Sequence, residues 1–191
     1  GRGPGVHFDR GCHGFERMSP PTARGLKRAC NSALPAPLEP GYAKPMRVVP
    51  IACLSDNYAY LVSADGSDEA LVIDASEAGP VLSALSHEGL RLGAILCTHH
   101  HWDHVGGNDA LVQALGPMPV FAHESSLGVI AQQNRGVSHE LRFQAAGLEI
   151  RALHVPGHTL DAISYVIEDC VFTGDTMFAA GCGRLFEGTA E

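Results

Sequence analysis

Thr98-His99-His100-His101-Trp102-Asp103-His104 is the stretch of this 191-residue chain on which the interpretation of its fold depends. It follows the apolar run Ala94-Ile95-Leu96-Cys97, which is typical of a buried strand. In extended backbone, residues i and i+2 point to the same side, so His99 and His101 can reach the same ion. His100 points to the opposite side and is not expected to be a ligand. Three histidines and an aspartate crowded behind a buried strand cost free energy unless something coordinates them, which predicts a metal site.

The end of this stretch lies where a helix is expected to begin, because Asp103 and His104 precede Val105-Gly106-Gly107-Asn108. The two glycines allow the backbone to turn tightly and to approach a ligand closely. A carboxylate at the N-terminus of a helix also interacts favourably with the helix dipole. These features suit a segment whose polar side chains surround a ligand.

Two later loops carry side chains of the same kind. Pro156-Gly157-His158-Thr159 follows one predicted strand, and Phe172-Thr173-Gly174-Asp175-Thr176 follows another. Each is ordinary loop chemistry when taken alone. All three segments follow strands, however, and loops at strand ends are a common place for sites because they converge on one edge of a sheet. We therefore expect His158 and Asp175 to lie beside the first cluster.

The order of the predicted elements favours an α/β fold. Strands and helices are interleaved, and the pairs within 47–62 and 162–173 resemble hairpins, so we expect a mixed sheet covered by helices. Apolar periodicity predicts helices at 78–88, 106–115 and 125–132, and strands at 47–51, 59–63, 70–74, 94–97, 120–122, 148–155, 162–168 and 170–173.

Residues 1–45 differ from the rest of the chain. They are rich in Gly, Pro and Arg, lack sustained periodicity, and cannot bury enough apolar surface to offset the entropy of ordering. We predict that this segment is disordered and that residues 46–191 form the folded domain. An organellar leader is an alternative interpretation of the segment.

Charge and hydropathy exclude several partners. The net charge is −8, with +4 in residues 1–45 and −12 in the remainder, so the main body repels nucleic-acid backbones. No apolar run approaches the ~20 residues that span a bilayer, so no membrane partner is expected. The six cysteines include no C-x-x-C pair, which fits a reducing cytoplasm. We expect a cytoplasmic monomer.

The pattern H-x-H-x-D-H, followed by His158 in P-G-H-T and Asp175 in T-G-D-T, resembles the metallo-β-lactamase superfamily. Its finer resemblance is to glyoxalase II, the hydroxyacylglutathione hydrolases. This resemblance runs from Met46 to Glu191 and implies an αββα sandwich. It is carried by Asp56-Asn57-Tyr58, by Thr98 to His104 with Gly106-Gly107-Asn108, by Phe172 to Phe178, and by Ala180-Gly181-Cys182-Gly183-Arg184-Leu185-Phe186-Glu187-Gly188.

The resemblance also implies a site for two divalent metal ions. One ion would be held by His99, His101 and His158, the second by Asp103 and His104, and Asp175 would bridge both. Zinc suits these ligands, and iron or manganese is compatible with them. In the family, another histidine several tens of residues beyond the bridging aspartate completes the second site, and a C-terminal helical domain helps to hold glutathione. This chain ends sixteen residues after Asp175, so we expect it to be truncated at its C-terminus.

The activity that the resemblance implies is hydrolysis of a 2-hydroxyacyl-glutathione thioester, such as S-lactoylglutathione, by a hydroxide that bridges the two ions. Asp103 would be the catalytic residue that orients or deprotonates the water. Arg184 and Phe186 match positions near the glutathione, with a solvated arginine and a core phenylalanine as the alternatives. The rival functions are a persulfide dioxygenase with a single iron and a non-catalytic, metal-binding remnant.

Three further residues near the motifs carry weaker expectations. Trp102 is expected to pack under its loop rather than to touch substrate. His123, at the end of a strand, is expected at the surface or behind the ligands. Asp74 ends another strand, where it either supports the metal loop by hydrogen bonding or has no special role.

Overall fold

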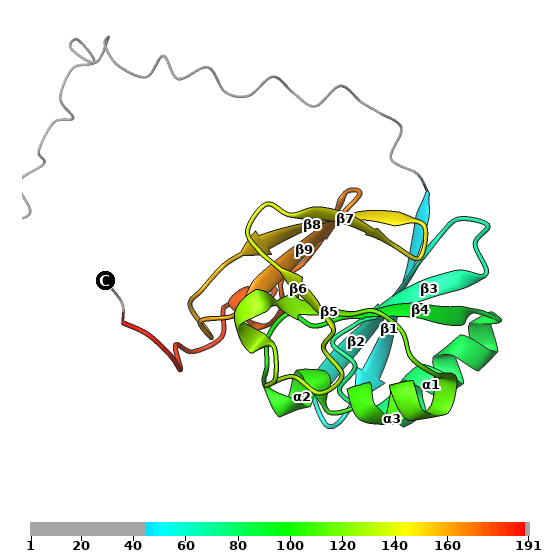
Figure 1. Ribbon diagram of the computed structural model, residues 1–191, viewed down its shortest axis with the longest axis horizontal. Coiled ribbons are helices and arrows are strands. Elements are labelled where there is room, and N and C mark those ends of the chain that lie inside the picture. The colour runs from blue at the N-terminus through cyan, green and yellow to red at the C-terminus, as the bar shows by residue number, and fades with distance from the viewer. Residues whose placement is uncertain (1–44, 190–191) are drawn as a thin grey trace, which may run out of the picture. The chain divides into compact units, whose positions relative to one another are not determined.

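The computed structural model describes residues 45–189, so the predicted disorder of residues 1–45 lies outside the described residues except for Pro45. Figure 1 shows strands and helices interleaved along this part of the chain. In chain order the elements are β1 (Met46–Cys53), β2 (Asn57–Ala64), β3 (Glu69–Ile73), α1 (Ala78–Glu88), β4 (Arg91–Leu96), α2 (Trp102–Val105), α3 (Asn108–Leu115), β5 (Val120–His123), β6 (Arg135–Val137), β7 (Arg142–Ala145), β8 (Leu148–His154), β9 (Ile163–Ile167) and β10 (Cys170–Phe172), with short 3₁₀ helices at Glu124–Ser126 and Gly174–Thr176.

The strands form two sheets. The six-stranded sheet has the order β1-β2-β3-β4-β5-β6, in which β1 to β3 are antiparallel and β3 to β6 are parallel. The four-stranded sheet has the order β10-β9-β8-β7 and is antiparallel throughout. The predicted mixed sheet and both predicted hairpins, β1–β2 and β9–β10, are therefore confirmed.

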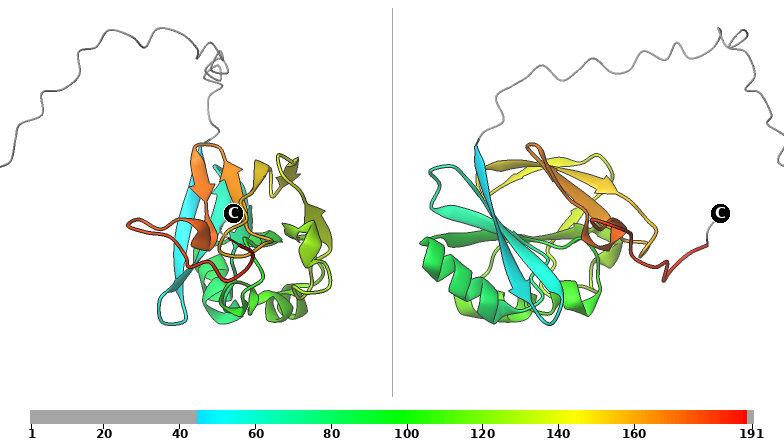
Figure 2. Two further views of the ribbon diagram at one scale, coloured as in Figure 1. Left: turned by 90° about the vertical axis from the view of Figure 1, so that its left-hand side faces the viewer. Right: turned by 180° about the vertical axis from the view of Figure 1, so that it is seen from behind.

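The central sheet is buried on both faces. Ala70 and Val72 of β3 pack in the cluster with α1 and α3, whereas Leu71 and Ile73 of the same strand pack in the cluster with β8 and β9. Figures 1 and 2 show the helices on one side of the six-stranded sheet and the four-stranded sheet on the other. Because both faces are covered, the inner strands are apolar runs rather than alternating ones.

The described residues thus form three successive layers: helices, the six-stranded sheet and the four-stranded sheet. The predicted α/β class is confirmed, and these layers are three of the four in an αββα sandwich. Within residues 45–189, no helix is long and apolar enough to cross a membrane.

One predicted helix is wrong, and two strands were not predicted. Residues 125–132 form only the 3₁₀ turn Glu124–Ser126, because Gly128 (φ +84°) and Gln132 (φ +64°) have left-handed backbone that ends any helix. The strands β6 and β7 were missed because three or four residues are too few to show periodicity. Neither difference affects the strand ends that carry the motifs.

Two histidines stack where β5 and β8 end. The rings of His123 and His154 are nearly parallel, with centroids 4.2 Å apart. Partial burial, together with the neighbouring His154 ring, lowers the pKa of His123 below its ordinary value. The folded protein therefore binds this proton more weakly than the unfolded chain does. The contribution of His123 to stability is therefore largest above about pH 6.5. It is lost as the pH drops from the pKa of His123 in the unfolded chain to its lower pKa in the folded protein.

Replacing His123 with asparagine should make stability less sensitive to acid. Asparagine can still accept the hydrogen bond that the Ser125 N–H donates to His123 Nδ1, but it does not titrate. We expect the urea midpoint to fall less between pH 7.5 and pH 5.0 in the variant than in the wild type. Other titrating groups are the same in both proteins and cancel in the comparison. Equal losses in both proteins would contradict this assignment.

Candidate metal centre

The three predicted segments meet at one edge of the two sheets. Thr98 to His104 follows β4, His158 lies in the loop between β8 and β9, and Asp175 lies in the 3₁₀ turn after β10. The sheets are tied together at this edge because the Ile163 N–H donates to the Thr98 carbonyl oxygen at 2.7 Å. The expectation that loops at the strand ends converge is thus met by the backbone itself.

Three imidazoles converge in the first part of the site. His101 Nδ1 lies 3.0 Å from His99 Nε2 and 3.0 Å from His158 Nε2. The ligand atoms of these three histidines all lie within 4.8 Å of one another. The same holds for the ligand atoms of His99, His104 and Asp175. His99 and His158 are buried, and His101 is partly exposed. The structure therefore brings together the three residues that the resemblance assigned to one metal ion.

The outer ring nitrogens are already engaged. His158 Nδ1 donates to the Arg184 carbonyl oxygen at 2.7 Å. His99 Nδ1 lies 3.0 Å from Thr98 Oγ1, which donates its own hydrogen to Asp74 and so accepts from the ring. Protons on the outer nitrogens leave lone pairs on the Nε2 atoms that face the centre. Engagement of the second nitrogen in this way is the usual arrangement of metal-binding histidines.

A second group of donors lies next to the first. His104 Nε2 is 3.3 Å from Asp175 Oδ1 and 3.6 Å from Asp103 Oδ2. The other oxygen of Asp175, Oδ2, is 3.4 Å from His158 Nε2, so this carboxylate faces both groups. The structure places Asp175 where a bridging ligand is expected, with Asp103 and His104 beside it.

Asp74 holds the base of the site, so its supporting role is favoured over that of an ordinary strand-end residue. Its Oδ1 accepts from the Thr98 N–H at 2.7 Å. Its Oδ2 accepts from Thr98 Oγ1 at 2.7 Å and from His104 Nδ1 at 3.0 Å. One buried carboxylate thereby orients the segment after β4 and the ring of His104.

The donor set fits divalent cations. His104 Nε2 is buried and makes no hydrogen bond of good geometry, although its outer nitrogen is satisfied. The lone pairs of His99 Nε2 and His158 Nε2 both face His101 Nδ1. Nitrogen lone pairs this close repel one another unless a proton or a cation lies between them. A mixture of imidazole and carboxylate ligands suits zinc, iron or manganese.

The electrostatics of the site separate its two halves. Burial, together with the neighbouring His104, lowers the pKa of His99 to about 4, which keeps that imidazole neutral. Burial also opposes charge on His104, but the carboxylates of Asp74 and Asp175 outweigh it and raise the pKa of His104 to about 10. The nearby His104 in turn lowers the pKa of Asp175. Negative charge is thus concentrated where the second cation would lie.

Comparison with known proteins identifies the fold family. Residues 55–127 match the metallo-β-lactamase superfamily. The hydroxyacylglutathione hydrolase of Chromohalobacter salexigens is 45% identical over 149 residues, which cover 76% of this chain and 57% of that protein.

The chain has the metallo-β-lactamase fold.

Solved structures of the superfamily agree with this assignment. ETHE1 from Myxococcus xanthus is 29% identical, with a TM-score of 0.63 over 73% of this chain and 61% of that one. The protein TTHA1623, in a di-iron-bound form, is 29% identical, with a TM-score of 0.60 over 72% of this chain and 76% of that one. The predicted metallo-β-lactamase-like fold is confirmed. The chain spans a little over half the length of the curated relatives it matches, 57% in the case above.

Asn57 holds the candidate ligand Asp103 in place, a role that the sequence did not reveal. Asn57 Nδ2 donates to the carboxylate oxygen Oδ2 of Asp103 and to its backbone carbonyl, each at 3.1 Å. Burial opposes the charged form of Asp103, but this hydrogen bond and the nearby His104 hold the pKa of Asp103 below its usual range. The only sequence signal was that Asn57 belongs to the stretch shared with glyoxalase II.

Two glycines allow the C-terminal segment to lie close to the candidate ligands. Gly174 has φ +50°, and a Cβ there would lie 2.3 Å from Thr98 Oγ1. A Cβ on Gly183 would lie 2.6 Å from His158 Nδ1 and 2.4 Å from the Asp175 carbonyl oxygen. Only glycine permits these close approaches, which fixes the C-terminal segment against the ligands.

The predicted substrate residues line a cavity beside the ligands. Arg184 and Phe186 border a space of about 480 Å³ together with His101, Asp103 and Trp102. The Phe186 ring is exposed, which excludes a core role, and its centroid lies 5.4 Å from that of His101. The expectation for Trp102 is wrong: its residue is 70% exposed and borders the cavity instead of packing under the loop.

Proposed function

We propose that this chain is the metal-binding part of a hydrolase that cleaves glutathione thioesters of 2-hydroxy acids, such as S-lactoylglutathione. The observation that carries the proposal is that six side chains of metal-ligating type converge beside a cavity bordered by Arg184. The 45% identity to a hydroxyacylglutathione hydrolase supports this substrate class.

The proposed ligand assignment follows the two groups of donors. His99, His101 and His158 would hold one divalent cation, Asp103 and His104 the second, and Asp175 both. Such cations lower the pKa of water from ~16 toward ~7 and polarise a carbonyl oxygen. Zinc is the cation we propose, and the di-iron form of TTHA1623 makes iron the alternative.

The protein's own residues would bind and orient the reactants. Asp103, fixed by Asn57, can accept a hydrogen bond from the attacking water and so direct it toward the carbonyl carbon. The departing glutathione thiol has an ordinary pKa of ~8.5, so its sulfur leaves with little help from an acid. Arg184 would hold a carboxylate of the glutathione, and the exposed Phe186 would contact its peptide.

The proposal is tested by supplying zinc to the purified 191-residue chain and measuring both metal content and hydrolysis of S-lactoylglutathione. We expect two ions per chain and release of free thiol. Two bound ions without thiol release would instead support a non-catalytic metal-binding protein. The chain has a single tryptophan, Trp102, so its fluorescence reports directly on occupancy of the site.

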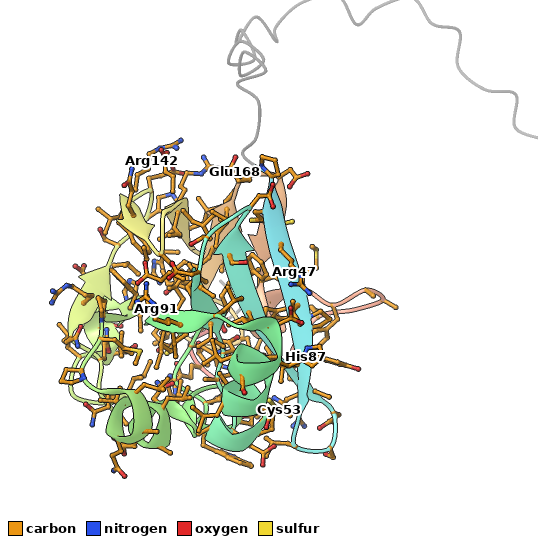
Figure 3. The ribbon with its side chains drawn as sticks, turned by 90° about the vertical axis from the view of Figure 1, so that its right-hand side faces the viewer. Arg47, Cys53, His87, Arg91, Arg142 and Glu168 are labelled. Carbon is orange, nitrogen blue, oxygen red and sulfur yellow. The ribbon has the colours of Figure 1, made fainter. Side chains whose placement is uncertain are left out.

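Replacing Arg184 with alanine should raise KM for the thioester and leave kcat nearly unchanged. A charge-assisted hydrogen bond contributes about 1.5–3 kcal/mol, which corresponds to roughly 10- to 100-fold in KM if it acts equally in ground and transition states. Steady-state kinetics measures the two constants. The matched control is Arg142→Ala, because Arg142 lies at the surface on β7 (Figure 3) and pairs with Glu149. Equal effects of the two substitutions would refute a role for Arg184 in binding.

A cytoplasmic location is also proposed. The four cysteines in the described part of the chain, Cys53, Cys97, Cys170 and Cys182, are free thiols, as expected in a reducing compartment. The expectations of a monomer and of no nucleic-acid partner stay predictions, the latter because of the acidic main body.

A further inference from the structure

A buried carboxylate lies behind the candidate metal centre, outside the predicted ligands. Asp161 belongs to the loop between β8 and β9, three residues after His158, and is only 5% exposed. Its Oδ1 accepts from His100 Nδ1 at 2.9 Å, and its Oδ2 accepts from Ser126 Oγ at 2.5 Å. A buried carboxylate with this many donors is held in one position.

The contact with His100 joins two loops. His100 lies between the proposed ligands His99 and His101; its Nδ1 meets Asp161, and its ring packs edge-to-face against that of His101, with centroids 5.0 Å apart. Fixing the His100 ring holds the backbone from which both neighbours project, and it also holds one face of the His101 ring. Because Asp161 belongs to the loop that carries His158, a single hydrogen bond connects the segments that supply all three imidazoles.

The same link is reinforced from the C-terminal segment. Glu187 Oε1 lies 3.6 Å from His100 Nε2, and Glu187 Oε2 accepts from the Leu160 N–H at 2.7 Å. Burial opposes the charged form of Asp161, but the hydrogen bonds from Ser126 and His100 outweigh it and lower its pKa. The carboxylate is therefore ionised and accepts from all of its partners.

We propose that Asp161 is a positioning residue: by holding His100, it fixes the segment 98–104 against the loop 155–162 so that three imidazoles face one cation. This inference rests on the proposed ligand set but not on the substrate. His100, Asp161 and Glu187 could themselves be considered a cation site. Both oxygens of Asp161 already accept hydrogen bonds, so we assign these three residues a structural role instead.

The test measures zinc affinity by competition with a chromophoric chelator and by Trp102 fluorescence. Asp161→Ala should weaken binding at the three-histidine site by roughly 10- to 100-fold, the usual effect of losing a partner behind a metal ligand. Asp161→Asn should stay within a few-fold of the wild type, because its amide oxygen can still accept from His100. Ser126→Ala, which leaves that contact intact, is the matched control and should have little effect.

A double-substitution cycle separates positioning from general damage. If Asp161 acts through His100, then His100→Ala should weaken zinc binding similarly, and the double variant should lose no more than either single variant. Additive losses, or an unchanged affinity in Asp161→Ala, would overturn the inference. A lower urea midpoint of the metal-free protein without any change in affinity would also overturn it, because it would show a merely structural role. If Asp161→Ala does not fold, His100→Ala and Asp161→Asn still decide the question.

The outcome can be distinguished from failure of the proposed function. A wild-type chain that binds no zinc would refute the ligand set itself. A wild-type chain that binds zinc, loses it in His101→Ala, and keeps it unchanged in Asp161→Ala would refute only the positioning role. Thioester hydrolysis is not needed for either result.

Discussion

Replacing His101 with alanine is expected to remove one of the two proposed metal ions and nearly all of the proposed thioesterase activity. His101 Nδ1 lies 3.0 Å from the inward-facing nitrogens of both His99 and His158, so it is the common neighbour of the first group. Without it, two imidazoles remain with the carboxylate of Asp175. The remaining set would hold a cation far more weakly.

The expected loss is large because the cations supply most of the chemistry. A catalytic cation contributes several kcal/mol of transition-state stabilisation, and each ~1.4 kcal/mol is tenfold in rate. We therefore expect kcat/KM to fall by roughly 100-fold or more. Metal content by elemental analysis should fall from two ions toward one per chain, with the urea midpoint of the metal-free protein little changed because His101 is partly exposed.

The control for this substitution is His87→Ala. His87 lies near the end of α1, where it pairs with Glu88, and its side chain is 85% exposed (Figure 3). This variant should keep both ions and full activity. A His101→Ala protein that also kept both would contradict the ligand assignment.

Much of the fold could be predicted because the deciding signals are local. Helix α1 was predicted with its observed bounds, since Val81 and Leu85 repeat at helical spacing and both are buried. The inner strands are recognisable as short apolar runs because the central sheet is covered on both faces. The failed helix at 125–132 shows the limit of such signals: Gly128 ends it through a backbone conformation that apolar spacing does not reveal.

The candidate ligands could be predicted from the sequence because each sits in a recognisable motif after a strand. The residues behind them could not. Asp161 contacts His100 across 61 positions of the chain, and Asn57 contacts Asp103 across 46. Nothing in the neighbourhood of either residue indicates its partner, because such pairs form only when the chain folds: the first joins the loops of two sheets, and the second joins β2 to the segment after β4. The exposure of Trp102 is likewise a property of the folded structure that its sequence neighbours do not indicate.

Asp74 is the supporting residue whose loss should be most damaging. Replacing it with alanine removes the acceptor for the Thr98 N–H, for Thr98 Oγ1 and for His104 Nδ1 at a site that is 4% exposed. Breaking a buried, charged pair by removing one partner costs about 3–5 kcal/mol. Asp74 also has φ +54°, a conformation that alanine tolerates less well than aspartate or asparagine.

Asp74→Asn separates these effects, because asparagine tolerates the left-handed backbone and keeps the shape. Its Oδ1 can still accept from the Thr98 N–H. Its NH₂ group, however, would face two other donors, the Thr98 hydroxyl and the His104 Nδ1–H. We expect affinity for the second cation to fall roughly 10- to 100-fold, and stability to fall by about 1–3 kcal/mol for the unsatisfied donors. Urea unfolding of the metal-free protein and zinc titration measure the two quantities separately. If Asp74→Asn bound two ions as tightly as the wild type, His104 would not depend on this carboxylate for its orientation, and the link from β3 to the second cation would have to be abandoned.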